Sequence, residues 1–444
     1  MTRTFLGLTS GCTAVLLVGV FAVGRAQDTL QVARLQEAAI RNDPRTGQYD
    51  LLRSATDLRL AAIGSERLPR FGLNGFASHQ SDVTKPTLNI LGAVFPNLPK
   101  GQWQSTIDVD QLLYDGGNIS RRREVERARQ AESASAVDVS LYGLRSEVNT
   151  AFFSAFLSQQ GSAEYEALVT DLDARLAAVR ARVEAGTALG RDAAEVEAER
   201  VAALVQRDEA RASRRASLAI LADLVGQPLD STAVLVLPAD EPEKAHPVRP
   251  ATAAQLRLRP EFEQFKQSRL RLEQEAALAG TENAPRLSAF GQAGVGLPGL
   301  DQFRTSSDAF WKAGVKVEWH PWTWNSAGRN AAALRMEQRV IERDEQALAR
   351  SLARQVVSDL EEIRRLAAGL ADDERVVALR TEVERQARAQ HDEGAITTAD
   401  YVTTRTDVLE ARLTLQRHRV ELAQARATYL TTLGFVPREG VQQP

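Results

Sequence analysis

The sequence contains very little cysteine, histidine or long apolar sequence, and each shortage excludes a class of protein. Its single cysteine, Cys12, lies within the first 26 residues, so the remainder can form neither disulfides nor thiolate metal sites. The five histidines have no metal-ligand spacing such as His-x-x-x-His, and there is no nucleophile elbow or phosphate-binding loop. No run of eighteen apolar residues follows Ala26, which excludes a membrane-spanning helix. The sequence therefore predicts no cofactor, no metal and no enzymatic activity.

The first 26 residues indicate export from the cytoplasm. Arg3 precedes an apolar run at 13–23, and the small residues that follow suit cleavage after Ala26, so residues 1–26 are predicted to be a signal peptide. Thr-Ser-Gly-Cys at 9–12 resembles a lipoprotein box, but the apolar run follows Cys12, so lipidation stays open. Without this segment the chain has 53 basic and 58 acidic residues, which excludes a nucleic-acid binder.

The chain is internally duplicated. Identical residues recur 208 positions apart: Val109 and Val317, Arg121 and Arg329, Gly161 and Gly369, Gly186 and Gly394, Asp192 and Asp400, and Gly226 and Gly434. Nearer each start the spacing is 216, as for Pro44 and Pro260, so one loop is eight residues longer in the first copy. A unit of about 200 residues is too long for a solenoid repeat. We predict a first repeat at 27–230, a linker at 231–250, a second repeat at 251–437 and a tail at 438–444.

Most of each repeat reads as long helices. The segments 118–185 and 326–393 lack proline and are rich in Ala, Arg, Glu and Leu, and each would extend about 100 Å as one helix. In the first copy, steps of three and four predict a coiled-coil seam at Val169, Leu172, Leu176, Val179 and Val183. A weaker seam is predicted in the returning helix of the second copy, at Val402, Thr406, Leu409, Leu413, Gln416 and Val420.

Each long helix is predicted to turn back at a glycine, Gly186 or Gly394, because glycine tolerates the left-handed conformation that ends helices. Asp192 and Asp400 lie six residues beyond these tips. An aspartate at this place is most often a helix cap, so a simple capping role stays open for both.

Four segments alternate with period two and are predicted as strands, at about 70–81, 103–114, 286–296 and 310–320. A soluble sheet with one wet face would alternate in the same way, but all five tryptophans lie in or beside these segments. Trp311 and Trp322 are eleven residues apart, about 28 Å of height at about 3.3 Å per residue and a tilt of about 40°, close to the apolar band of an outer-membrane barrel. We predict a membrane girdle of Trp103, Trp311, Trp319 and Trp322. Four strands cannot close a membrane barrel, so the barrel must be shared between subunits.

Four sequence segments together resemble the TolC family of outer-membrane efflux proteins: Leu-Pro-Arg-Phe at 68–71, Val-Asp-Gln-Leu-Leu-Tyr-Asp-Gly-Gly at 109–117, Glu-Gly-Ala-Ile-Thr-Thr-Ala-Asp-Tyr-Val at 393–402, and Ala-Thr-Tyr-Leu-Thr-Thr-Leu-Gly at 427–434. The resemblance implies a mainly α fold with a small transmembrane β part. It also implies a homotrimer with a twelve-stranded barrel and a periplasmic helical tunnel, which docks to a periplasmic adaptor and an inner-membrane pump. The implied function is an outer-membrane exit duct.

The resemblance also assigns the narrow periplasmic aperture. Asp400 matches the first aspartate of the family's acidic ring, and Asp192 matches an aspartate in the equivalent turn of the first copy. Thr403 and Ile396 stand where the best-known members have a second aspartate and an arginine, so their gating bonds do not transfer. A periplasmic adaptor is the alternative reading, although adaptors usually have one hairpin flanked by β-rich domains. The transported substrate, the pump and the resting state of the duct are not encoded in any of these motifs.

Overall fold

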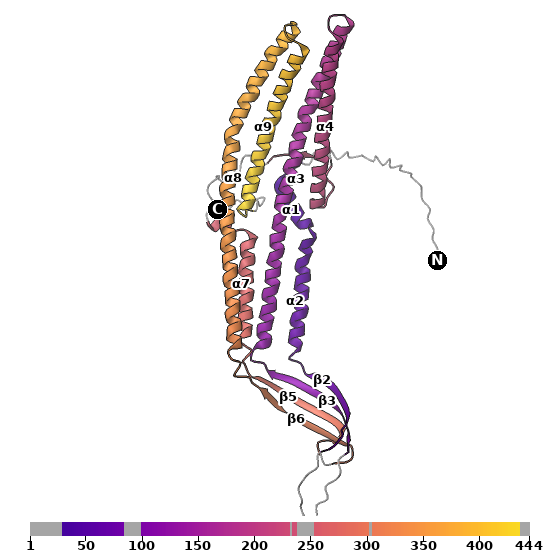
Figure 1. Ribbon diagram of the computed structural model, residues 1–444, viewed down its shortest axis with the longest axis vertical. Helices are drawn as coiled ribbons and strands as arrows, with labels where there is room; N and C mark the ends of the chain where they lie inside the picture. Colours follow the sequence, from indigo (N-terminus) through magenta and orange to yellow (C-terminus); the bar gives the residue numbers. More distant parts are fainter. Residues whose placement is uncertain (1–28, 84–98, 231–232, 238–252, 302–303, 436–444) are drawn as a thin grey trace, which may run out of the picture.

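The computed structural model describes residues 29–83, 99–230, 233–237, 253–301 and 304–435. Long helices run nearly side by side for most of the length of the molecule, and a four-stranded sheet lies at one end (Figure 1). The predicted signal peptide, the tail, most of the linker and most of the longer first-copy loop lie outside the described residues. The boundaries of the two repeats therefore stay a prediction.

Two helical hairpins form the end opposite the sheet. Helix α3 (Asn118–Glu184) pairs with α4 (Gly190–Val225), and α8 (Ser326–Asp392) pairs with α9 (Thr398–Thr432). Helices α3 and α8 each have 67 residues, so each is about 100 Å long at 1.5 Å per residue. The predicted pair of long hairpins is confirmed, and Figure 1 shows both tips at the same end of the molecule.

Shorter elements pack against the sheet-proximal half of the long helices and around their middle. They are β1 (Thr29–Leu30), α1 (Val32–Asn42), the 3₁₀ turn η1 (Pro44–Gly47), α2 (Gln48–Ser65), β4 (Val234–Leu235), α6 (Ala253–Leu256) and α7 (Pro260–Ala279). Helix α2 contacts α3, and α7 contacts both α3 and α8. The largest buried cluster joins α1, α3 and α4 around Phe152 and Phe153, whose rings meet edge to face with centroids 5.3 Å apart.

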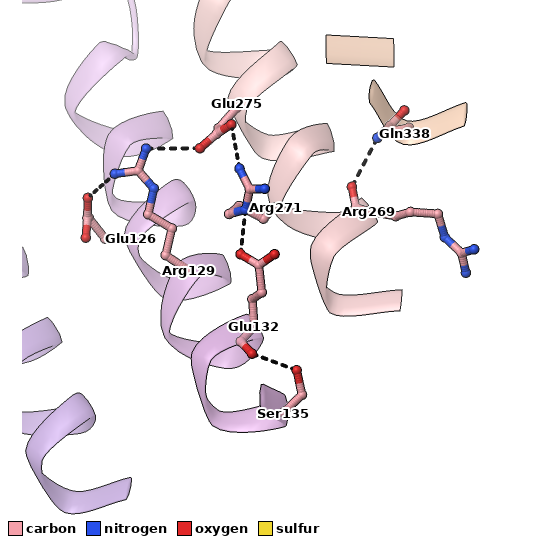
Figure 2. Close-up of polar contacts among 8 residues, drawn as sticks. All are labelled: Glu126, Arg129, Glu132, Ser135, Arg269, Arg271, Glu275 and Gln338. Atoms are coloured by element: carbon pink, nitrogen blue, oxygen red, sulfur yellow. Dashed lines mark hydrogen bonds and ion pairs between the residues drawn. The ribbon is translucent and has the colours of Figure 1, made fainter. Parts of the chain in front are cut away.

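Ion pairs join the two repeats where α3 contacts α7 (Figure 2). The Arg129 guanidinium lies 3.0 Å from Glu126 of its own helix and 3.0 Å from Glu275 of α7. Arg271 of α7 lies 2.5 Å from Glu132 of α3 and 2.9 Å from Glu275. Because one charge is shared by several partners, this network constrains the relative position of the two helices more than one exposed pair would.

The sheet is antiparallel with the order β2-β3-β5-β6, so the two repeats meet at its centre. Its strands are β2 (Arg70–His79), β3 (Gly101–Tyr114), β5 (Arg286–Leu297) and β6 (Asp308–Glu318). Within the described part of the chain, the outer edges of β2 and β6 pair with no further strand. No described helix combines the length and the apolar character needed to cross a membrane. The predicted fold class, long helices with four strands, is confirmed.

The predicted coiled-coil seam of the first hairpin is confirmed. Leu172, Leu176 and Val179 are buried and pack with Val196 and Ala203 of α4. Of the predicted seam of α9, Val420 is buried and the other five residues are half-buried, and Leu409 packs against the aliphatic cluster of the first hairpin. The buried positions instead include a spacing of seven: Tyr401, Val408, Leu415, Leu422 and Tyr429. Helix α9 contacts α3 and α4 as well as α8, so its apolar face is divided between α8 and the first hairpin.

Candidate functional site

The strand register places most apolar side chains of the four strands on one face of the sheet. Phe71 is opposite Val109, Ile107 is opposite Ala293, and Ala293 is opposite Trp311. These side chains are open to the surroundings in the single chain, with exposed fractions of 76% for Phe71 and 75% for Trp311. A large exposed apolar face needs a covering partner or a lipid environment.

The other face of the sheet carries the charged side chains, together with Phe76, Phe290 and Phe310. Asp108 is opposite Gln292, which is opposite Lys312, so one polar row crosses three strands. The Asp108 carboxylate accepts hydrogen bonds from the amides of Asn74 and Gln292 and from the Thr106 hydroxyl. Charges of both signs share this face: Arg70, Asp108, Asp110, Arg286, Asp308, Lys312, Lys316 and Glu318. This arrangement suits a water-filled interior without strong selection for the sign of a solute's charge.

All five tryptophans are exposed. Trp103 and Trp311 lie on the apolar face, and the exposed fractions of Trp322 and Trp324 beyond β6 are 83% and 84%. The indole Nε1 of Trp319 donates a hydrogen bond of 3.1 Å to the Asn283 carbonyl, which holds the ring beside the strand end. Trp311 aligns with Ile107, four residues farther along β3 than Trp103, so the two are not at one register level.

The two hairpin tips share one construction. Gly186 and Gly394 have φ of 73° and 77°, in the left-handed region. The residue after each glycine donates its backbone N–H to a carbonyl of the preceding helix at 2.8 Å, from Thr187 to Arg182 and from Ala395 to Gln390. These bonds satisfy carbonyls at the helix end, and the left-handed φ favours glycine at both tips.

Asp400 and Asp192 both occupy the third position of the returning helix. The Asp400 carboxylate accepts hydrogen bonds from the backbone N–H and the hydroxyl of Thr397, and the Thr397 oxygen accepts from the Asp400 N–H. These bonds from Thr397 lower the pKa of Asp400 below its usual value. Asp192 makes only one of these two kinds of bond. Its carboxylate accepts a hydrogen bond of 3.1 Å from the Leu189 N–H, but the leucine side chain has no oxygen that could accept a bond from the Asp192 N–H. Both residues act as caps, and a pore role stays a prediction.

A polar cluster near the tips was not found by sequence reasoning. The Tyr401 ring is 1% exposed, and its hydroxyl donates to Glu384 of α8 at 2.7 Å. The Arg175 guanidinium of α3 lies 3.8 Å from the centre of that ring, and the His391 ring of α8 lies 5.4 Å from it. Burial, followed by the hydrogen bond to Glu384, raises the pKa of Tyr401 to about 12.

The same cluster connects the second hairpin to the first. Arg405 of α9 lies 3.3 Å from Asp171 of α3 and 3.9 Å from Glu384 of α8. The Thr406 hydroxyl lies 3.2 Å from a carboxylate oxygen of Glu199 on α4. We call Asp171, Arg175, Glu199, Glu384, Tyr401 and Arg405 the inter-hairpin cluster. Its sequence signal is weak, because one tyrosine in a long helix predicts only a buried position.

Among the residues that the structure describes, neither end of the molecule has the features of a metal centre. Over the described ranges, no group of three or more histidine, cysteine, aspartate or glutamate side chains is arranged to hold a metal ion. His418 of α9 lies 2.6 Å from Asp373 of α8, and this pair links the two helices of the second hairpin. The chemical content of the site is therefore an amphipathic sheet at one end and paired, capped helical tips at the other.

The fold is similar to solved structures of outer-membrane channels. A membrane protein of Pseudomonas aeruginosa is similar with a TM-score of 0.67 and 15% identity, over 93% of this chain and 92% of that one. CusC, a transmembrane channel, is similar with a TM-score of 0.66 and 15% identity, over 92% of this chain and 93% of that one. The outer-membrane channel MtrE of Neisseria gonorrhoeae is similar with a TM-score of 0.64 and 16% identity, over 91% of this chain and 89% of that one.

This chain is similar to these channels in fold and not in sequence. No protein-family model matches the sequence, and no curated protein is similar to it in sequence. The three solved structures nevertheless match this chain over nearly its whole length. The resemblance to the TolC family is therefore confirmed at the level of the fold, and the chain has the architecture of these channels from the sheet to the hairpin tips.

Proposed function

We propose that three copies of this chain form a duct through the outer membrane and the periplasm, which passes substrates from an inner-membrane pump to the exterior. The three sheets would close into a twelve-stranded barrel, with the apolar face toward lipid and the polar face toward water. The long helices would form a periplasmic tunnel, and Asp400 would line its narrow end. A periplasmic adaptor would dock at the tunnel, as the resemblance implies.

The observation that carries this proposal is the four-stranded sheet, which has an apolar face and two outer edges that pair with no other described strand. Unpaired backbone groups in lipid each cost several kcal/mol, so such a sheet is stable in a membrane only when other strands close it. The solved channels of the same fold support an outer-membrane location. The adaptor alternative is disfavoured, because these solved structures are channels and because the two hairpins of this chain share one amphipathic sheet.

The two faces of β3 allow a matched test of the membrane location. Ile107 lies on the apolar face and Gln104 on the polar face of the same strand. An arginine on a lipid-facing position costs up to about 2–4 kcal/mol, the cost depending on its depth in the bilayer. We therefore expect Ile107→Arg to reduce the amount of folded protein in outer-membrane fractions, while Gln104→Arg leaves it unchanged. Equal effects would contradict the assignment of the two faces.

Pore formation has its own test. The purified protein in detergent should have the mass of three chains and should form ion-conducting channels in planar bilayers. Quenching by brominated lipids should place Trp103, Trp311, Trp319 and Trp322 near the interfaces, because indole favours that zone. A monomer without conductance would refute the duct, whereas strongest quenching at the bilayer centre would refute only the girdle.

A further inference from the structure

The two lateral borders of the molecule carry complementary features. In Figure 1 one border consists of α8 and β6, and the opposite border consists of α2 and β2 in the half near the sheet. Each border therefore contains one of the two sheet edges that lack a strand partner among the described residues. Two borders of different composition on one chain suit head-to-tail association, which generates a ring when the rotation closes.

The α8 border carries exposed apolar residues close to the sheet. Met336 and Val340 have exposed fractions of 51% and 59%. At 100° per residue they lie on the side of α8 opposite the buried Ala331 and opposite Gln338, whose amide donates to the Arg269 carbonyl of α7 at 3.0 Å. This stripe thus faces away from the neighbour that α8 has within the chain.

The α2 border has the same character. Leu51 and Leu58 have exposed fractions of 71% and 73%, although both sit in a regular helix with a partner on its other side. The buried residues of α2 are Thr56 and Ile63, on the side that contacts α3. An isolated exposed leucine needs no explanation, but two leucines seven residues apart form a stripe on one side of the helix.

Charges of opposite sign accompany the two stripes. Asp50 and Asp57 immediately precede Leu51 and Leu58, and Arg335 and Arg339 immediately precede Met336 and Val340. None of these four side chains forms an ion pair with another described residue. The α2 border therefore presents unpaired carboxylates where the α8 border presents unpaired guanidinium groups, which is the complementarity that fixes register between two surfaces.

The heights of the stripes above the sheet also agree. Leu51 lies fourteen residues before the end of α2, and Val340 lies fourteen residues after the start of α8, so both are about 21 Å along their helices at 1.5 Å per residue. Antiparallel neighbours within the chain are in contact at similar offsets. Arg59, six residues before the end of α2, lies 3.6 Å from Glu126, eight residues after the start of α3.

We propose that the exposed stripe of α8 packs on the stripe of α2 in the next copy, with Val340 beside Leu51 and Arg339 beside Asp50. This subunit seam rests on the proposed trimeric duct and continues the pairing of β6 with β2 of the neighbouring copy. Farther from the sheet the same two borders carry exposed Val376, Leu379 and Val383 on α8, and Val201 and Val205 on α4. The seam therefore extends toward the hairpin tips.

Disulfide trapping tests the seam in the full-length protein. The predicted mature chain has no cysteine, so Leu51→Cys with Val340→Cys introduces the only two thiols. A disulfide requires Cα atoms about 4.4–6.8 Å apart. We expect oxidation of membranes to convert most of the double variant into covalent trimers on non-reducing gels. On the same gels each single variant should migrate as one uncross-linked chain, because the two positions are on different borders.

Glu342→Cys with Leu51→Cys is the matched control, because Glu342 is exposed at a similar height but points to another side of α8. Cross-linking of Leu51→Cys alone would indicate a two-fold contact and overturn the seam. A trimeric mass with no cross-link in the double variant would overturn the seam while leaving the duct intact. A monomeric mass would refute the duct itself.

Charge exchange provides a second readout that does not depend on thiols. Arg339→Asp alone should place two carboxylates together and lower the fraction of trimer that survives mild heating in detergent by at least twofold. Adding Asp50→Arg should restore that fraction, because the pair is rebuilt with its signs reversed. If the double variant is no better than the single variant, Arg339 does not meet Asp50.

Discussion

The two hairpins have nearly the same lengths and the same glycine turn at their tips, but they differ in what holds their tip halves together. Near its tip the first hairpin has an aliphatic seam in which Leu172, Leu176 and Val196 are buried. In the second hairpin, Ala387 is the only residue of α8 beyond residue 370 that is buried among the described positions. Polar contacts join α8 to α9 in this half, from Tyr401 to Glu384 and from His418 to Asp373, and the buried apolar residues there, such as Val408 and Leu415, belong mainly to α9.

This difference separates a hairpin that is stable by itself from one that depends on particular partners. Apolar contacts are non-directional and tolerate small displacements, whereas hydrogen bonds between buried groups need a fixed geometry. Tyr401 and Arg405 also contact the first hairpin through Arg175 and Asp171. The second hairpin is therefore held partly by the first, and we expect it to open more readily.

The largest expected effect comes from the aliphatic seam. Leu172→Ala removes a side chain that is 2% exposed, and such truncations cost about 2–5 kcal/mol. We expect the free energy of local opening of the first hairpin to fall by that amount, measured by amide hydrogen exchange across α3 and α4. Thr381→Ala in α8 is the comparison, because the Thr381 hydroxyl donates to the Val377 carbonyl of its own helix and bonds to no other described residue. A comparable loss for Thr381→Ala would contradict the distinction between the hairpins.

Tyr401→Phe tests the polar contacts of the second hairpin. The change removes the hydroxyl that donates to Glu384, a carboxylate with only 12% of its side chain exposed. Leaving a buried acceptor without its donor costs about 1–3 kcal/mol, so exchange should accelerate in α8 and α9 near the tip and much less in α4. Tyr165→Phe is the control, because the Tyr165 hydroxyl has no hydrogen-bond partner among the described residues.

Most of the fold could be predicted from the sequence because it depends on periodicity. Alternation in β3 and β6, the steps of three and four around Leu172, and the paired glycines Gly186 and Gly394 each indicate one local structure. The α9 seam could not be predicted, because its residues face two neighbours whose positions are set by tertiary packing. The inter-hairpin cluster could not be predicted either, since the contact of Arg175 with Tyr401 joins residues 226 positions apart.

Alkaline pH should loosen the second hairpin selectively. Burial and the hydrogen bond to Glu384 raise the pKa of Tyr401 to about 12, while an unfolded tyrosine titrates near 10. The folded state thus favours the protonated phenol, so this stabilisation is complete below pH 10 and is lost as pH rises toward 12. Absorbance at about 295 nm in the parent minus that in Tyr401→Phe isolates this tyrosine from Tyr49, whose pKa is also about 12. A midpoint near pH 10 in the difference would contradict burial of the phenol.

The smallest structural effect is expected at the two capping aspartates, and there the hairpins should differ in conductance. Asp400 is exposed, and the hydrogen bonds from Thr397 lower its pKa, so its carboxylate is ionised at neutral pH. The cap is fully present above pH 4 and is lost only as pH falls through the lowered pKa.

Three ionised copies of Asp400 around the proposed axis would attract cations. We therefore expect Asp400→Asn to reduce cation selectivity and block by multivalent cations in planar bilayers, with trimer assembly unchanged. Asp192→Asn removes a similar cap from the first hairpin and should change conductance less, because the resemblance assigns the narrowest ring to the second copy. Equal conductance and block for the parent and Asp400→Asn would leave Asp400 with its capping role alone.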